Sequence, residues 1–332
     1  MIREIFCIAC AILLLASSLR ADYRESLERE DYPAAIAELK PLAEKGDAKA
    51  QTYLGILYAN GQGVPQSYKD ALRWYRKAAD KGYVAAQFNL GMLYDEGHGL
   101  PKDYAEAARW YRKAAEQGLA DAQFNLGVMY ARGKGVKQDD AEAFGWYRKA
   151  ALQGMADAQY NLGLMYDNGR GVPKDYAEAA RWYRLAAEQG DADAQYNLGV
   201  MYAAGQGVSR DYVEAQKWYR QAAEKGDAGA QYGLASLYAR GEGVEQDDAE
   251  AAMWCRKAAD KGYAEAQYSL GLMYLHGRGL PLDQVQAYLW LSLAAAQGHQ
   301  EAGNRRDLLA ETMTPAGLAE AKALVAGWKP VK

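Results

Sequence analysis

The chain has 332 residues, of which 50% are hydrophobic and 25% are charged, and its formal net charge is -4. This composition is typical of a soluble, well-packed protein. Acidic and basic residues are interspersed along the whole chain. The sequence therefore lacks the basic surface with which proteins bind nucleic acid or an anionic membrane, and we expect no nucleic-acid partner.

The first 21 residues differ from the rest of the chain. A short basic start at Arg3 leads into an apolar run over residues 5–16, which is followed by small residues up to Ser18 and by Ala21. This order is typical of a secretory signal peptide that is cleaved after Ser18 or Ala21. The alternative is an uncleaved membrane anchor, but the run is shorter than the roughly 20 residues that a spanning helix needs. We therefore expect an exported protein, periplasmic or secreted, with no membrane span after cleavage of residues 1–21.

Cleavage would also remove two of the three cysteines, Cys7 and Cys10, and leave Cys255 alone. The mature chain is then expected to have no internal disulfide, since an oxidising compartment permits disulfides without requiring them. Cys255 replaces a tyrosine of the repeat described below, so we interpret it as a buried, inert thiol.

Three further segments follow the signal peptide. Residues 22–49 are predicted to form a degenerate N-terminal repeat that acts as a cap. Residues 50–301 contain one 36-residue unit repeated seven times without insertion or deletion, and the copies open at Ala50, Ala86, Ala122, Ala158, Ala194, Ala230 and Ala266. Residues 302–332 are predicted to form a C-terminal helical cap. A period of this length indicates stacked supersecondary units, each too small to bury its own apolar face.

Each unit is predicted to contain two helices, here called helix A and helix B. In the unit that opens at Ala86, apolar residues at helical spacing predict helix A over residues 86–96, and the glycines at 97 and 99 end it. Asp103 followed by Glu106 is a capping-box pattern, which predicts that helix B begins there and continues to about residue 117. The recurrence of these carboxylates and glycines favours structural roles over catalytic pairs or a phosphate-binding loop.

Bulky and small residues alternate in helix B in a way that predicts the core. Each unit has a tryptophan with alanines before and after it, and a leucine in helix A at the matching position. Small residues let neighbouring helices approach, and the indole fills the remaining space. We interpret this aromatic stripe as core packing rather than a cofactor site. The tryptophans are Trp74, Trp110, Trp146, Trp182, Trp218, Trp254 and Trp290.

The pattern A-x-x-x-L-G-x-x-Y-x-x-G-x-G-V, followed by D-x-x-x-A-x-x-W-Y-x-x-A-A-x-x-G, resembles the Sel-1-like repeats, a family related to the tetratricopeptide repeats. The resemblance implies an all-α fold, a right-handed α-solenoid superhelix of stacked helix-turn-helix repeats, with helix A of each unit on the concave face. Departures are few: Ala235 replaces the glycine of helix A, and Cys255 and Leu291 replace the tyrosine that follows tryptophan.

The resemblance also implies where a partner would bind. By similarity to tetratricopeptide arrays, the concave face would present helix A positions two, six, nine and ten, counted from the opening alanine. Position two forms an aromatic series, and positions nine and ten carry charges that vary from unit to unit, as in a groove that binds a peptide or a partner helix. The candidate residues are Phe88, Phe124, Tyr160, Tyr196, Tyr232, Tyr268, Asp95, Glu96, Arg132, Asp167, Asn168, Arg240 and His276.

We therefore predict a protein–protein interaction scaffold or adaptor of the bacterial cell envelope. An alternative is that the aromatic series packs against neighbouring helices and binds nothing. A second alternative is a glycan- or cell-wall-associated binding protein, because tyrosine and tryptophan can stack on sugars. Some cysteine-rich relatives have been linked to β-lactam hydrolysis, but their hallmark is a disulfide in each repeat, which this chain lacks.

The sequence gives no reason to expect catalysis. The three histidines, His98, His276 and His299, lie at turns or links in different units, and no nucleophile–base pair or zinc-ligand spacing occurs. We therefore predict a protein that is not an enzyme and that uses no cofactor or metal.

Overall fold

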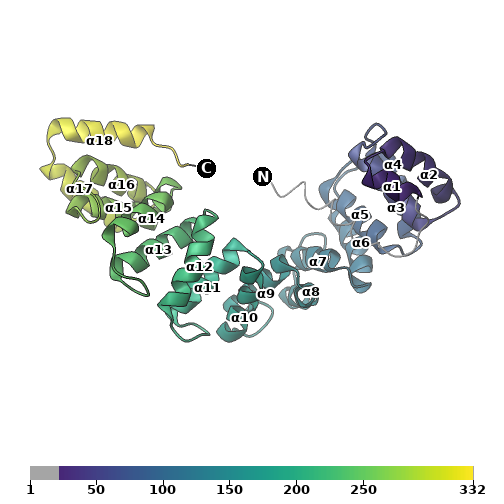
Figure 1. Ribbon diagram of the computed structural model, residues 1–332, viewed down its shortest axis with the longest axis horizontal. Helices are drawn as coiled ribbons and strands as arrows, with labels where there is room; N and C mark the ends of the chain where they lie inside the picture. The colour runs from purple at the N-terminus through teal and green to yellow at the C-terminus, as the bar shows by residue number, and fades with distance from the viewer. Residues whose placement is uncertain (1–21, 332) are drawn as a thin grey trace. The chain divides into compact units, whose positions relative to one another are not determined.

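The computed structural model describes residues 22–331, and within this range it contains eighteen α-helices and no strand. The predicted signal peptide, residues 1–21, lies outside the described residues. Two compact units form: one contains residues 22–158 and 170–172, and the other contains residues 159–169 and 173–331. The all-α fold predicted from the repeat is confirmed, with helices following one another in pairs within each unit (Figure 1).

The odd-numbered helices from α3 to α15 are the A helices, and the even-numbered helices from α4 to α16 are the B helices. The A helices are α3 (Ala48–Asn60), α5 (Val84–Glu96), α7 (Ala120–Arg132), α9 (Ala156–Asn168), α11 (Ala192–Ala204), α13 (Ala228–Arg240) and α15 (Ala264–His276). The B helices are α4 (Tyr68–Ala79), α6 (Tyr104–Glu116), α8 (Asp140–Leu152), α10 (Tyr176–Glu188), α12 (Tyr212–Glu224), α14 (Asp248–Asp260) and α16 (Gln284–Ala296). Helices α1 (Asp22–Glu28) and α2 (Tyr32–Glu44) precede them.

Each A helix begins two residues earlier than the sequence predicted. In α5 the N-cap is Tyr83, whose backbone is extended, so the helix starts at Val84 rather than Ala86. In α3 and α13 the corresponding N-caps are Asp47 and Asp227, and each carboxylate accepts a hydrogen bond from the amide of the opening alanine. The alanine that opens the sequence repeat is therefore the third residue of the helix.

The two glycines after each A helix have different structural roles. Gly133 is the C-cap of α7 and adopts a left-handed conformation with φ 65°, which closes the helix. A Cβ on Gly135 would lie 2.1 Å from the carbonyl oxygen of Tyr104, so this glycine lets the loop press against the start of α6 in the preceding unit. The Gly-x-Gly motif is thus both a helix stop and a contact between units, as a structural turn requires.

The B helices begin at aspartate caps. Oδ1 of Asp103 accepts hydrogen bonds from the amides of Ala105 at 3.1 Å and Glu106 at 3.0 Å. The other half of the predicted capping box is absent here, because the amide of Asp103 donates to the carbonyl oxygen of Tyr94 in the preceding A helix instead. The aspartate therefore joins the two helices of a unit as well as capping the second one.

The predicted stripe of tryptophan, leucine and alanine is the core of each unit. In α5 and α6, Leu90 and Ala114 are fully buried and Trp110 is 5% exposed. Glutamines connect successive units at the edge of this core: Nε2 of Gln117 donates to Oε1 of Gln87 at 2.8 Å and to the carbonyl oxygen of Gly82 at 3.1 Å. Equivalent bonds recur in other units, so a buried polar ladder accompanies the apolar one.

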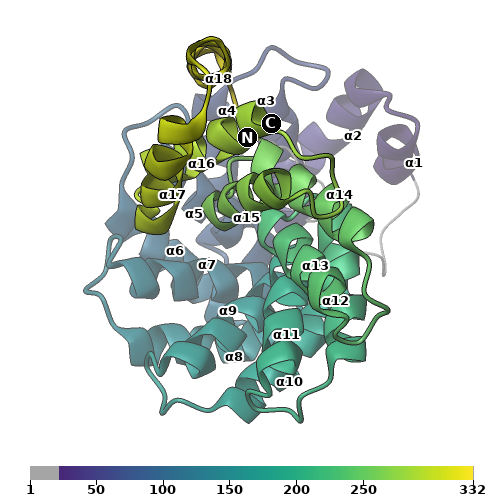
Figure 2. The same cartoon turned by 90° about the vertical axis from the view of Figure 1, so that its left-hand side faces the viewer.

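Two helices cap the second unit: α17 (Gln300–Thr312) and α18 (Pro315–Gly327). Helix α18 packs on α16, as Figure 2 shows, and buries Ala321 fully. Beyond it, the indole of Trp328 meets that of Trp290 edge-on at 6.2 Å between ring centroids, and the amide of Val331 donates to the carbonyl oxygen of Asp260 at 2.8 Å. Among residues 22–331, no helix is long and apolar enough to span a membrane.

Candidate binding pocket between helices α13 and α15

The aromatic residues at position two of the A helices pack against rings of their own unit. Phe88 lies 5.6 Å from Tyr111 between ring centroids and is only 4% exposed. The same contact joins other pairs at 5.7–6.1 Å: Phe124 with Tyr147, Tyr160 with Tyr183, and Tyr196 with Tyr219. Part of each ring therefore stabilises its own unit, and Phe88 offers almost no surface to a partner. The predicted aromatic series has a structural role, and its binding role stays a prediction.

The predicted charged positions of the first unit mostly meet neighbouring side chains. Asp95 accepts a hydrogen bond from Nζ of Lys134 at 2.6 Å, where Lys134 lies between the two glycines of the next turn. Glu96 lies 2.9 Å from Nδ1 of His98. Arg132 is exposed at the end of α7. These residues line the turns of successive repeats rather than one compact site.

The predicted polar positions of the second unit also make local contacts. Asp167 accepts a hydrogen bond from the hydroxyl of Tyr183 at 3.4 Å, and Nδ2 of Asn168 donates to the carbonyl oxygen of its own helix, at Leu164. Arg240 forms an exposed ion pair with Glu242 at 2.7 Å. Of the predicted residues, Tyr232 and His276 are brought together in one pocket, which the next paragraphs build from its sequence.

A glycine in helix A and a tyrosine in helix B form one packing pair in most repeats. A Cβ on Gly199 would lie 2.6 Å from Cδ1 of Tyr219, so the ring can occupy its place only because the glycine has no side chain. The same conflict exists in four other units, where a Cβ added to the glycine would meet the tyrosine ring at 2.4–2.8 Å. These pairs are Gly55 with Tyr75, Gly91 with Tyr111, Gly127 with Tyr147, and Gly163 with Tyr183.

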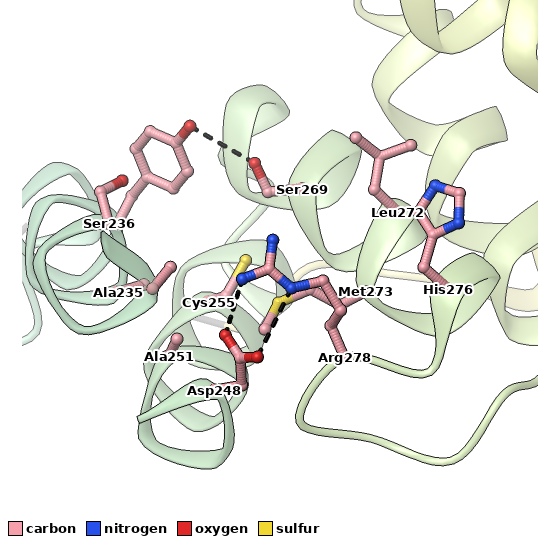
Figure 3. A pocket seen from close by; sticks show the side chains of 12 residues that line it. Ala235, Ser236, Asp248, Ala251, Cys255, Ser269, Leu272, Met273, His276 and Arg278 are labelled. Carbon is pink, nitrogen blue, oxygen red and sulfur yellow. Dashed lines mark hydrogen bonds and ion pairs between the residues drawn. The ribbon is translucent and has the colours of Figure 1, made fainter. Parts of the chain in front are cut away.

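Helices α13 and α14 contain the one repeat in which both members of this pair change. Ala235 takes the place of the glycine and Cys255 takes the place of the tyrosine. The methyl group of Ala235 fills far less space than the tyrosine ring that is lost. A cavity of about 240 Å³ lies here, lined by both altered residues and by Ser269, Leu272 and other residues of α15 (Figure 3).

The cavity has an apolar interior and polar groups around it. Ala251 and Met273 contribute apolar surface. Nη2 of Arg278 forms an ion pair with Oδ1 of Asp248 at 2.9 Å, and Figure 3 shows the arginine side chain directed towards this carboxylate. The hydroxyl of Ser269 donates to that of Tyr232 at 3.3 Å. A concave apolar site with a few placed polar groups is the usual form of a small binding site.

Cys255 at this site is a buried thiol. Its Sγ donates to the carbonyl oxygen of Ala266 at 3.2 Å, and the side chain is 1% exposed. Burial raises the pKa of the thiol to about 12, although the nearby Arg256 acts to lower it. The reactive thiolate is therefore scarce near neutral pH, and the geometry does not equip Cys255 as a nucleophile. Among residues 22–331, no group of three or more His, Cys, Asp or Glu side chains could hold a metal ion.

The sequence contained the signal for this pocket, but it was visible only in the pairing of two departures. Ala235 and Cys255 each look like a minor substitution when taken alone. The structure shows that the two positions pack against each other in the other repeats, so a simultaneous change at both alters the shape of the groove. Leu291 also replaces a tyrosine, but it fills its site: a Cβ on Gly271 would lie 2.8 Å from Cγ of Leu291.

The helix pairs, their turns and their core define the class of this protein, an α-solenoid built from helix-turn-helix repeats. The chain belongs to the Sel1 repeat family: the Sel1 repeat pattern matches residues 48–83, 84–119, 120–155, 156–191, 192–227, 228–263 and 264–299. The matched units begin two residues before the opening alanines of the sequence repeat, where the A helices begin. Proteins of this family generally mediate protein–protein interaction and are non-catalytic scaffolds.

Solved structures with the same fold support this assignment. A Sel1 repeat protein from Oxalobacter formigenes is 39% identical over 86% of this chain and 85% of its own, with a TM-score of 0.64. The protective antigen c5321 of uropathogenic Escherichia coli, which displays an SLR fold, is 28% identical over 87% of this chain and 93% of its own, with a TM-score of 0.52. A search of curated proteins gave no match.

Proposed function

We propose that this protein is an exported, non-catalytic scaffold of the bacterial cell envelope that binds a segment of a partner protein between α13 and α15. The observation that carries the proposal is the pocket of about 240 Å³ at Ala235 and Cys255. The family supplies the general role of protein interaction. The pocket supplies a place for it, since protein interfaces depend on a few side chains anchored in well-packed pockets.

The position of the pocket supports a partner segment rather than a free small molecule. Its lining comes from two successive A helices, and it includes Tyr232 and Ser236 of α13 and Leu272 and His276 of α15. These are positions two, six and ten of the repeat, which belong to the face that tetratricopeptide arrays use for peptides. A segment lying along this face would pass directly over the cavity.

Export is proposed from the sequence of residues 1–21. If the signal peptide is cleaved as proposed, the mature protein recovered from the periplasm or the medium will begin at Leu19 or Asp22. Cell fractionation with N-terminal sequencing tests this directly. A full-length chain that starts at Met1 and remains with the membrane fraction would contradict it and favour an anchor.

Capture from envelope extract tests the binding role. The variant S236E/L272E places two carboxylates at the pocket, at positions that are partly buried. The matched control is V213E in α12, because Val213 is 62% exposed on a B helix. We expect the wild type and V213E to retain the same partner and S236E/L272E to lose it. Equal retention by all three would refute the pocket as the binding site, and retention of polysaccharide alone would favour the glycan alternative.

A further inference from the structure

The pocket has the place and the surroundings of a tyrosine side chain, which identifies what a partner would insert there. This inference rests on the proposed function and specifies the chemistry of the partner. In the preceding repeat, the ring of Tyr219 lies between two glycines: a Cβ on Gly199 would be 2.6 Å from it, and a Cβ on Gly233 would be 2.9 Å from it. The equivalent positions one repeat later are Ala235 and Ser269, and both line the cavity.

The charges around one of the tyrosines extend this comparison. Tyr147 occupies the equivalent place three repeats earlier. Burial raises the pKa of Tyr147 to about 12, while Arg132 and Arg170 lower it and Asp140 raises it, so three charged groups reach this phenol. Arg170 and Asp140 form an ion pair at 2.8 Å.

All three charges recur around the pocket although the phenol does not. Arg240, Arg278 and Asp248 stand three repeats after Arg132, Arg170 and Asp140. The ion pair between Arg278 and Asp248 has nearly the same length, 2.9 Å, and both residues line the cavity. The charged frame of a tyrosine site is therefore kept, while the tyrosine itself is replaced by Cys255.

We propose that this cavity binds the side chain of a tyrosine carried by a partner segment. The ring would lie between Ala235 and Ser269, and the phenol hydroxyl would meet the polar rim formed by the ion pair. Size is compatible with this occupant, because a cavity of about 150 Å³ is enough to admit a benzene ring and this one is about 240 Å³. The tyrosine would act as an anchor that fixes the register of the bound segment.

Binding of p-cresol, the free tyrosine side chain, tests the occupant without knowledge of the partner. The protein would carry ¹³C-labelled methionine methyl groups and be titrated with p-cresol, with toluene in a parallel titration. We expect the Met273 methyl signal to shift, since Met273 lines the cavity, and the signal of Met253, which is 40% exposed on α14, to stay in place. We expect a dissociation constant on the order of 1 mM for a ligand of this size, and binding of toluene that is at least several-fold weaker.

The variant A235G/C255Y fills the cavity from within. It restores the glycine–tyrosine pair of five other repeats, so we expect it to keep the helical circular dichroism signal and to lose p-cresol binding by at least tenfold. If this variant does not fold, the wild-type response of Met273 against Met253 still decides the matter. A missing Met273 response, tighter binding of toluene, or unchanged p-cresol binding by a folded A235G/C255Y would each overturn the proposal.

The same variant separates this inference from the proposed function. Capture of the partner lost in both S236E/L272E and A235G/C255Y supports a ring inserted in the cavity. Capture lost in S236E/L272E but kept in A235G/C255Y overturns the tyrosine anchor and leaves the groove as a binding surface. Capture kept in both variants overturns the proposed function itself.

Discussion

The pairing of glycine with tyrosine makes a quantitative prediction about stability. In α11, a Cβ on Gly199 would lie 2.6 Å from Cδ1 and 2.8 Å from Cε1 of Tyr219. Overpacking of this kind costs about 1–3 kcal/mol. The better helix propensity of alanine returns about 1 kcal/mol. We therefore expect G199A to lower the free energy of unfolding by about 1 kcal/mol.

The partner substitution should reverse the sign of the alanine effect. Y219C removes a buried ring and is expected to cost about 3 kcal/mol, as for other large-to-small core changes. In G199A/Y219C the methyl group no longer meets the ring, so the overpacking cost disappears and the natural pair of Ala235 and Cys255 is reproduced. We expect the double variant to be more stable than the sum of the single variants predicts, by about 1–3 kcal/mol.

Urea unfolding of the four proteins, followed by far-ultraviolet circular dichroism, measures this coupling. The control is G145A in α8, because a Cβ on Gly145 meets nothing within 4 Å. It should stabilise the protein by about 1 kcal/mol through helix propensity alone. Additive effects of G199A and Y219C within about 0.5 kcal/mol, or a stabilising G199A like the control, would refute the packing argument.

Two further predictions concern the helix caps and the buried phenols. D211A removes the cap that accepts hydrogen bonds from the amides of Val213 and Glu214, at 2.9 and 3.1 Å, and should lower the free energy of unfolding by about 1 kcal/mol, whereas D211N should lose less; equal losses in urea unfolding would count against capping. Burial raises the pKa of Tyr147 to about 12 and that of Cys255 to about 12, from ordinary values of 10.0 and 9.0. The folded state therefore holds these protons longer than the unfolded state, so their contribution to stability is complete below pH 9 and falls as pH rises to 12. A urea midpoint that stays constant between pH 9 and 12 would contradict this.

The repeat made most of the fold predictable. A period of 36 residues, a helix-ending Gly-x-Gly and an aspartate before each B helix were enough to place both helices of every unit. The starts of the A helices were less well placed, because the capping residue lies before the opening alanine and varies between Asp47 and Tyr83. A varied cap has no fixed sequence signal.

The candidate site was less predictable, because exposure and pairing depend on three-dimensional contacts. Position two of the repeat looked like a binding surface, yet the ring of Phe88 is buried against Tyr111. The capping box was predicted as reciprocal, yet the amide of Asp103 bonds to a carbonyl of the preceding helix. The pocket depends on two substitutions that lie 20 residues apart in the sequence and only their packing in space connects them.

The most direct test of the account is site-specific photo-crosslinking in the cells that make this protein. A benzophenone amino acid would replace Ser236, which lines the pocket, and in a second strain Val213, which is exposed on a B helix. The account predicts a discrete crosslinked protein partner from position 236 and none from position 213. The same products from both positions, or none from position 236, would contradict a binding site between α13 and α15.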